Sequence, residues 1–247
     1  MTLSRHELDA SGEFVAAVEL WLLDRDMTAD RLAAIEAATC RLSEDEINRV
    51  AAMSDRQQAR LWAAGRTALR LLVEGRCGPS IRQQPFQYTP TGRPTIASSD
   101  IDFSVTDSGP YLLIAIACKG RIGIDIEQPR EIKMPQERID LIVAAGEGLA
   151  GFAAAPLQSW TRIEAFAKAT APSLASALAM LGVQGHGEGR LEVRQVHERA
   201  RQARIDAAVD VHDIPLPQAL FGAVACHSSP PPSVRILDIA TIDRLTG

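Results

Sequence analysis

The sequence predicts an α+β protein built from two similar halves. Four short segments are apolar and rich in β-branched residues, as strands are: residues 15–23, 111–118, 121–127 and 220–226. Two longer segments have helical periodicity or composition: residues 55–74 and 144–175. A short internal similarity relates AVAC at 223–226 to AIAC at 115–118, and Asp238-Ile239 to Asp125-Ile126. We therefore expect an N-terminal half of residues 1–122 and a C-terminal half of residues 123–247.

The first half is expected to begin with a strand over residues 15–23, which ends at the polar run 24–26. Ser43 then opens a helix, because Glu46 follows three residues later and completes a capping box. The second helix, over about residues 55–74, repeats its apolar residues at helical spacing and is expected to end at Gly75 and Gly78.

The remaining elements are defined mainly by glycine and proline. Residues 84–99 form a turn-rich connector, and Lys119-Gly120 is a plausible hairpin turn between strands 111–118 and 121–127. Prolines interrupt the helical segment 144–175, and four glycines predict a loop over 182–189. A proline-rich turn at 228–233 is expected to join strand 220–226 to a strand at 234–239. For residues 191–211 both strand and helix stay open.

The composition is that of a globular protein, with 46% hydrophobic and 23% charged residues. A formal net charge of −5 argues against nucleic-acid binding, which needs a basic face. Neither a signal peptide nor an apolar run of about 18 residues is visible, so we expect a cytoplasmic protein without a membrane segment. The four cysteines lack CxxC spacing and the five histidines lack zinc-ligand spacing, so neither set predicts a metal site.

Residues 123–127, Gly-Ile-Asp-Ile-Glu, are the most informative segment. Side chains alternate along a strand, so Asp125 and Glu127 share one face. Two adjacent carboxylates repel each other unless a hard cation lies between them. The segment therefore indicates either a cation site or an exposed polar strand face.

The second informative segment, at 160–168, contains Glu164 and Lys168 four residues apart. On a helix they share one face, either as a surface ion pair or as part of the site formed by Asp125 and Glu127. Residues 92–94 (Gly-Arg-Pro) and 102–109 carry no catalytic signal when each is taken alone.

In order and spacing, these segments resemble the 4′-phosphopantetheinyl transferases of the larger, surfactin-synthetase-activating type. The resemblance rests on GRP at 92–94, F-x-x-x-x-SG at 103–109, GIDIE at 123–127 and W-T-x-x-E-A-x-x-K at 160–168. It extends from strand VELWLLD through LSEDE and the G-R-x-x-L-R helix to strand FGAVAC, and so covers nearly the whole chain. GIDIE and WTRxEAxxK are its specific motifs. The family implies a pseudo-dimeric fold, and a monomer is plausible.

The resemblance also implies a reaction. Coenzyme A would lie between the halves, with Mg²⁺ held by Asp125, Glu127 and Glu164. The serine of an acyl or peptidyl carrier protein would attack the phosphate that bears pantetheine, as in the priming of fatty acid, polyketide or nonribosomal peptide biosynthesis. Glu164 or Lys168 would help deprotonate this serine. Among the contacts to coenzyme A, the resemblance suggests Arg93 and, less directly, Arg70.

The chain departs from the family pattern at two segments. Thr106-Asp107-Ser108-Gly109 stands where the family has Ser-His-Ser-Gly, whose histidine meets a coenzyme A phosphate, so Thr106 and Asp107 occupy cofactor-binding positions in a degenerate motif. Ile163 replaces the lysine of Trp-x-x-Lys-Glu. One unit charge pair about 5 Å apart at an effective dielectric near 20 is worth roughly 3 kcal/mol, so an anion at 107 could weaken coenzyme A binding by orders of magnitude.

Three functional hypotheses follow. The first is an active Mg²⁺-dependent transferase acting on coenzyme A and a carrier protein. The second, favoured by Asp107 and Ile163, is a catalytically impaired relative that binds a carrier protein or assists a biosynthetic cluster. The third is an unrelated α+β protein in which the motifs coincide by chance.

Overall fold

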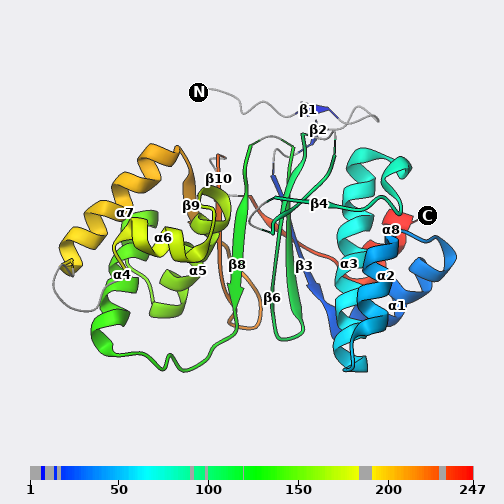
Figure 1. The fold of residues 1–247 in the computed structure, drawn as a ribbon, viewed down its shortest axis with the longest axis horizontal. Helices are drawn as coiled ribbons and strands as arrows, with labels where there is room; N and C mark the ends of the chain where they lie inside the picture. Colours follow the sequence, from blue (N-terminus) through cyan, green and yellow to red (C-terminus); the bar gives the residue numbers. More distant parts are fainter. Residues whose placement is uncertain are drawn as a thin grey trace. The chain divides into compact units, whose positions relative to one another are not determined.

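The computed structural model describes residues 7–8, 14–15, 18–89, 92–97, 100–118, 120–183, 191–227 and 232–246 (Figure 1). It is a mixed α+β fold, as predicted. The chain divides into two compact units: unit 1 comprises residues 1–20, 100–106 and 115–234, and unit 2 comprises residues 21–99, 107–114 and 235–247. No helix in the described part of the chain is both long and apolar enough to span a bilayer.

Unit 1 contains an antiparallel three-stranded sheet of order β8-β10-β9. Its strands are β8 (Gly123–Glu127), β9 (Asp210–Asp213) and β10 (Phe221–Cys226). Asp125 pairs with Ala223 in the centre of the β8–β10 ladder. Four helices accompany this sheet: α4 (Gln136–Ala150), α5 (Pro156–Thr170), α6 (Leu174–Leu181) and α7 (Val193–Ala207).

Helix α5 packs against β8 and β10, while α4 packs against α5 and α7. The approach of α5 to β8 explains the glycine that begins GIDIE: a Cβ atom on Gly123 would collide with the Ala165 carbonyl oxygen and lie 2.6 Å from the Ala169 nitrogen. Ile163 and Phe166 of the same helix are completely buried in the apolar core of this unit. The two motif segments are therefore brought together where Gly123 lets α5 lie directly against β8.

Unit 2 is mainly helical. Its helices are α1 (Arg25–Ala38), α2 (Glu44–Ala52), α3 (Arg56–Cys77), the 3₁₀ turn η1 (Pro79–Ile81) and α8 (Ile239–Thr246), and the short strands β4 (Gln87–Tyr88) and β5 (Pro94–Thr95) pair with each other. The predicted capping box is confirmed, because Ser43 accepts from the Glu46 backbone nitrogen while the Glu46 carboxylate accepts from that of Ser43.

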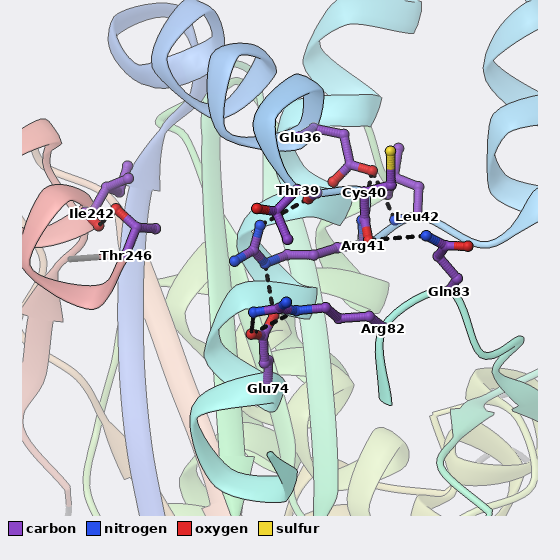
Figure 2. A network of polar contacts seen from close by, with 10 residues as sticks. All are labelled: Glu36, Thr39, Cys40, Arg41, Leu42, Glu74, Arg82, Gln83, Ile242 and Thr246. Atoms are coloured by element: carbon purple, nitrogen blue, oxygen red, sulfur yellow. Dashed lines mark hydrogen bonds and ion pairs between the residues drawn. The ribbon is translucent and has the colours of Figure 1, made fainter. Parts of the chain in front are cut away.

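Hydrogen bonds and ion pairs hold the segment that connects α1 to α2 against helix α3 (Figure 2). The Glu36 carboxylate accepts from the backbone nitrogens of Arg41 and Leu42, at 2.8 and 2.9 Å. The Arg41 guanidinium donates to Glu74 at 2.7 Å, and Arg82 donates to the other oxygen of the same carboxylate. The two arginines lower the pKa of Glu74 against the opposing effect of its burial.

A four-stranded sheet has the order β11-β3-β7-β6. Its strands are β3 (Val18–Asp24), β6 (Asp102–Ser108), β7 (Tyr111–Ala117) and β11 (Val234–Ile236). The short strands β1 (Glu7–Leu8) and β2 (Phe14–Val15) pair with each other. The strands predicted at 15–23, 111–118, 121–127 and 220–226 are thus confirmed, with shifted ends.

Two predicted strand pairings are wrong. The hairpin expected around Lys119-Gly120 is not formed, because β7 belongs to the four-stranded sheet whereas β8 pairs with β10; Lys119 itself lies outside the described residues. In the same way, β10 and β11 belong to different sheets, and α8 begins at Ile239 within the predicted strand 234–239. The chain crosses from one sheet to the other at both places.

Other local expectations have mixed outcomes. The segment left open at 191–211 is mostly helix α7, followed by β9. Gly75 lies inside α3, and Gly78 alone caps it. Most of the loop expected at 182–189 and of the turn at 228–233 lies outside the described residues. The halves 1–122 and 123–247 stay a prediction, and each compact unit contains segments from both sides of that boundary.

Candidate functional site

The candidate site begins at β8, where the predicted alternation of side chains is present. Ile124 and Ile126 are buried in apolar surroundings, as one face of a half-buried strand requires. Asp125 is only 4% exposed, and Glu127 at the end of the strand is half-buried. The alternative of an exposed polar face is therefore wrong for Asp125, whose burial requires a hydrogen-bonding or charged partner.

Lys168 of α5 supplies that partner. Its Nζ atom lies 2.7 Å from Oδ1 of Asp125 and 3.0 Å from the Ile124 carbonyl oxygen, and it is 3.7 Å from Oε2 of Glu164. Glu164 and Lys168 thus form the expected i,i+4 pair, but the shorter contact of the ammonium is to Asp125. The two motifs contribute to a single cluster of charges within unit 1.

Burial changes the acid strength of Asp125. Desolvation raises its pKa from 3.8 to about 7, and the nearby negative charge of Glu164 raises it as well. The Lys168 ammonium opposes this rise, as do hydrogen bonds from Lys168 and from the Thr106 hydroxyl. The Asp125 carboxyl is therefore poised to change its charge near neutral pH.

Glu127 has a different cation. Its two carboxylate oxygens accept from Arg130 at 2.8 and 3.3 Å. The hydrogen bond to Glu127 raises the pKa of Arg130, and the negative charges of Glu164 and Asp125 raise it further. The negative charges of all three predicted metal ligands therefore raise the pKa of Arg130, although only Glu127 is hydrogen-bonded to its guanidinium.

The donor set can be tested against the Mg²⁺ that the resemblance implies. Carboxylate oxygens suit this ion, and the Lys168 ammonium already marks a position near which oxygens of Asp125 and Glu164 come together. Within the described residues, however, no three His, Cys, Asp or Glu side chains converge as a ready metal site. The pair Asp125 and Glu164 fits a hard cation, whereas Glu127 would first have to leave Arg130.

Strand β6 carries the two predicted cofactor residues Thr106 and Asp107. The buried Thr106 hydroxyl donates to Oδ1 of Asp125 at 2.9 Å, so Thr106 joins the charge cluster. The Asp107 carboxylate is exposed and is bonded to Arg25, at 3.0 Å. The anion that the sequence places at position 107 is therefore neutralised by a cation from α1.

Arg70 and Arg93, the other predicted cofactor residues, belong to unit 2. Arg70 is buried: its Nε donates to Glu46 at 2.5 Å, its Nη2 donates to the Gln84 carbonyl oxygen, and its guanidinium lies over the Phe86 ring. These contacts give Arg70 a structural role in holding α2 to α3. Arg93 is half-buried in the segment before β5, where its backbone nitrogen donates to the Thr89 hydroxyl.

The remaining motif residues of α5 are structural. Arg162 is completely buried and donates to both oxygens of Asp213 at 2.7 Å, and also to the carbonyl oxygens of Gly146 and Phe152. Ile163, which replaces the expected lysine, lies in the core. Position 163 therefore contributes packing rather than charge to this helix.

Sequence reasoning missed Arg25 and Arg130. Arg130 could have been found, because it follows Glu127 by three residues in a short polar segment. Arg25 meets Asp107 across 82 positions of the chain, and neither position carries a local signal for this pairing.

Comparison with known proteins finds curated relatives. No protein-family model matches. A putative 4′-phosphopantetheinyl transferase, slr0495, of Synechocystis is 31% identical over 152 residues, which cover 56% of this chain and 60% of that protein. The 4′-phosphopantetheinyl transferase HetI of Nostoc is 31% identical over 117 residues, covering 46% and 48%. The chain spans about half to three-fifths of the length of these relatives.

Proposed function

We propose that this chain is a member of the 4′-phosphopantetheinyl transferase superfamily, and that it transfers 4′-phosphopantetheine from coenzyme A to a serine of an apo acyl or peptidyl carrier protein in a Mg²⁺-dependent reaction. The names of the two relatives support the reaction class. The observation that carries the proposal is the charge cluster in which Asp125 of β8 and Glu164 of α5 share the ammonium of Lys168.

The proposed reaction forms one bond and breaks one. The carrier serine oxygen attacks the phosphorus that bears pantetheine, and the bond from this phosphorus to the bridging pyrophosphate oxygen breaks. The products are the phosphopantetheinyl serine and adenosine 3′,5′-bisphosphate, and the serine proton goes to a base of the enzyme. Phosphoryl transfer of this kind depends mainly on positioning and charge stabilisation.

The chain's own residues fit these tasks. Asp125 and Glu164, and Glu127 once released from Arg130, would hold the ion. When bound, Mg²⁺ would neutralise charge on the pyrophosphate. Glu164 is the proposed base, since it is the more accessible of the two carboxylates beside Lys168. Lys168 holds both carboxylates in place and would offer its ammonium to the developing phosphate charge.

The phosphate contacts are a further part of the proposal. Arg93 is the candidate for a coenzyme A phosphate, while Arg70 is the weaker candidate because Glu46 and Gln84 already engage its guanidinium. Thr106 would act through its hydrogen bond to Asp125. The Arg25 contact reduces the charge penalty expected from Asp107.

We also propose the pseudo-dimeric arrangement, in a monomeric cytoplasmic enzyme. Its support is the reciprocal crossing of the chain between the two sheets: β7 and β11 lie in one sheet, and β8 and β10 lie in the other. The strands β7 and β10 carry the similar segments 115–118 and 223–226, whereas Asp238-Ile239 follows β11 and so does not match the strand position of Asp125-Ile126.

A non-catalytic, carrier-binding relative is the second candidate. The observation that favours it is that cations of the chain itself neutralise the predicted metal ligands, Lys168 at Asp125 and Glu164 and Arg130 at Glu127. In such a non-catalytic protein, the charge cluster would stabilise the fold and would not catalyse transfer.

A transfer assay decides between the two candidates. The protein is incubated with apo carrier protein, coenzyme A and Mg²⁺, and the intact mass of the carrier is measured. The proposed function requires a gain of one phosphopantetheine, which must be absent with EDTA and with a carrier whose acceptor serine is alanine. No mass gain with apo carriers of the fatty acid, polyketide and nonribosomal peptide classes would contradict transferase activity.

A further inference from the structure

We propose that Asp107 is a positioning residue that acts through Arg25 to fix the β6–β7 turn and, with it, Thr106 against Asp125. This inference rests on the proposed transferase function. It assigns a role to a residue that the sequence marks as a departure from the family pattern. Removing the charge of Asp107 should then slow turnover, whereas removing an anion that repels a substrate phosphate would improve coenzyme A binding.

Arg25 clamps the β6–β7 turn through several hydrogen bonds. Its Nη2 donates to the Asp107 carboxylate at 3.0 Å and to the Gly109 carbonyl oxygen at 2.6 Å. Its Nε and its backbone nitrogen both donate to the Pro110 carbonyl oxygen, at 3.2 and 3.0 Å. One side chain therefore holds three of the four residues from 107 to 110.

Burial favours this clamp. The Arg25 side chain is 10% exposed and that of Asp107 is 57% exposed. A largely buried guanidinium needs a nearby anion, whereas the exposed carboxylate could be hydrated without a partner. The pair therefore serves mainly to hold Arg25 in the turn, and a neutral residue at 107 would remove the counter-charge of Arg25.

Thr106 and Asp107 are consecutive residues of one strand, so their side chains leave it in opposite directions. Asp107 meets Arg25, and the Thr106 hydroxyl meets Oδ1 of Asp125 at 2.9 Å. A rotation or slip of the strand end at residue 107 would therefore move the Thr106 hydroxyl away from the carboxylate. Displacements of about 1 Å are enough to cost catalysis about 100-fold.

Two roles for Asp107 predict different kinetics. If its negative charge repelled a coenzyme A phosphate, Asp107→Asn would lower the KM for coenzyme A and leave kcat unchanged. If it positions Thr106, the same change lowers kcat and leaves that KM within about twofold, because no substrate contact is lost.

The experiment compares the wild type with Asp107→Asn, Arg25→Met and the double variant in the carrier transfer assay. We expect kcat to fall about tenfold or more in each single variant. The double variant should be no slower than Arg25→Met alone, because Asp107 acts only through Arg25 whereas Arg25 also holds Gly109 and Pro110. Asp107→Glu, which keeps the charge, should retain more kcat than Asp107→Asn. Asp243→Asn is the matched control, since Asp243 pairs with Arg31 on the exposed side of α1.

Hydrogen exchange of the backbone amides of residues 106–109 and 111 gives a readout that does not depend on turnover. Faster exchange of these amides in Asp107→Asn, but not in Asp243→Asn, is expected. A lower KM for coenzyme A with unchanged kcat, independent effects in the double variant, or unchanged exchange would each overturn the positioning role. A wild type that transfers nothing overturns the proposed function and the kinetic role of Asp107 together. The exchange measurement then tests only whether Asp107 and Arg25 hold the β6–β7 turn.

Discussion

The Nζ atom of Lys168 lies 2.7 Å from Oδ1 of Asp125, and this contact joins the most specific helix motif of the chain to its most specific strand motif. Glu164, one turn earlier on the same helix, is 3.7 Å from the same ammonium. An ion pair of this kind satisfies a buried carboxylate, yet it places a positive charge where a divalent ion would otherwise bind. The cluster is therefore both the strongest sign of a cation site and a competitor for it.

Replacing Lys168 by methionine should strengthen Mg²⁺ binding. A unit charge about 5 Å from the ion, at an effective dielectric near 20, opposes binding by roughly 3 kcal/mol, so a gain of about tenfold or more in affinity is expected even after screening. Isothermal titration of Mg²⁺ into the wild type and Lys168→Met measures it. Lys133→Met is the control, because Lys133 is exposed outside the cluster. Unchanged or weaker binding in Lys168→Met would contradict competition.

Replacing Glu164 by glutamine should reduce transfer about 100-fold or more, which is the usual scale for the loss of a general base. The melting temperature should change little, because this side chain is partly exposed and its ion pair to Lys168 is long. Glu198→Gln on α7, where Glu198 forms a surface pair with Arg201, is the matched control. A wild-type rate in Glu164→Gln would remove Glu164 from the proposed mechanism.

Asp125 should make the stability of the metal-free protein depend on pH. Its folded-state pKa of about 7 lies above the ordinary value of 3.8, so between these values the folded state binds more protons than the unfolded state. Stability from this group is therefore lost as pH rises from about 4 to 7. Asp125→Asn does not titrate, so its free energy of unfolding relative to the wild type should increase between pH 5 and pH 8.

Urea denaturation in EDTA at both pH values measures this difference. The variant Asp238→Asn is a suitable control, because hydrogen bonds from Thr241 lower the pKa of Asp238, so this carboxylate stays ionised and its contribution to stability should not change between pH 5 and pH 8. An equal difference between Asp125→Asn and the wild type at pH 5 and pH 8 would show that Asp125 does not titrate in this range.

Much of the site could be predicted because its signals are local. Alternation along β8 placed Asp125 and Glu127 on one face, and helical spacing placed Glu164 beside Lys168. The meeting of the two segments followed only from the family resemblance. The structure gives it a physical reason, since the absence of a Cβ at Gly123 lets α5 approach the strand.

The errors arose where local signals allow several partners. Gly120 has the positive φ expected of a turn, but β7 and β8 are both largely buried, so the pattern of side chains along each strand could not decide which strands they pair with. Helix α1 was missed because Asp24 was interpreted only as the polar end of a strand. Its carboxylate also accepts from the backbone nitrogens of Asp26 and Met27 and so caps the helix.

Restoring the lysine that the family pattern has at position 163 should harm rather than help the protein. Ile163 is fully buried in the apolar core between α5 and its neighbours. A lysine there would bury an ammonium without a partner or force the helix away from the core, at a cost of several kcal/mol. We therefore expect Ile163→Lys to unfold at much lower urea concentration than the wild type. Ile163→Met, which nearly conserves volume, should cost less than about 1.5 kcal/mol. An Ile163→Lys variant with wild-type stability would show that this position can reach solvent, and the interpretation of residue 163 as a purely structural replacement would then be wrong.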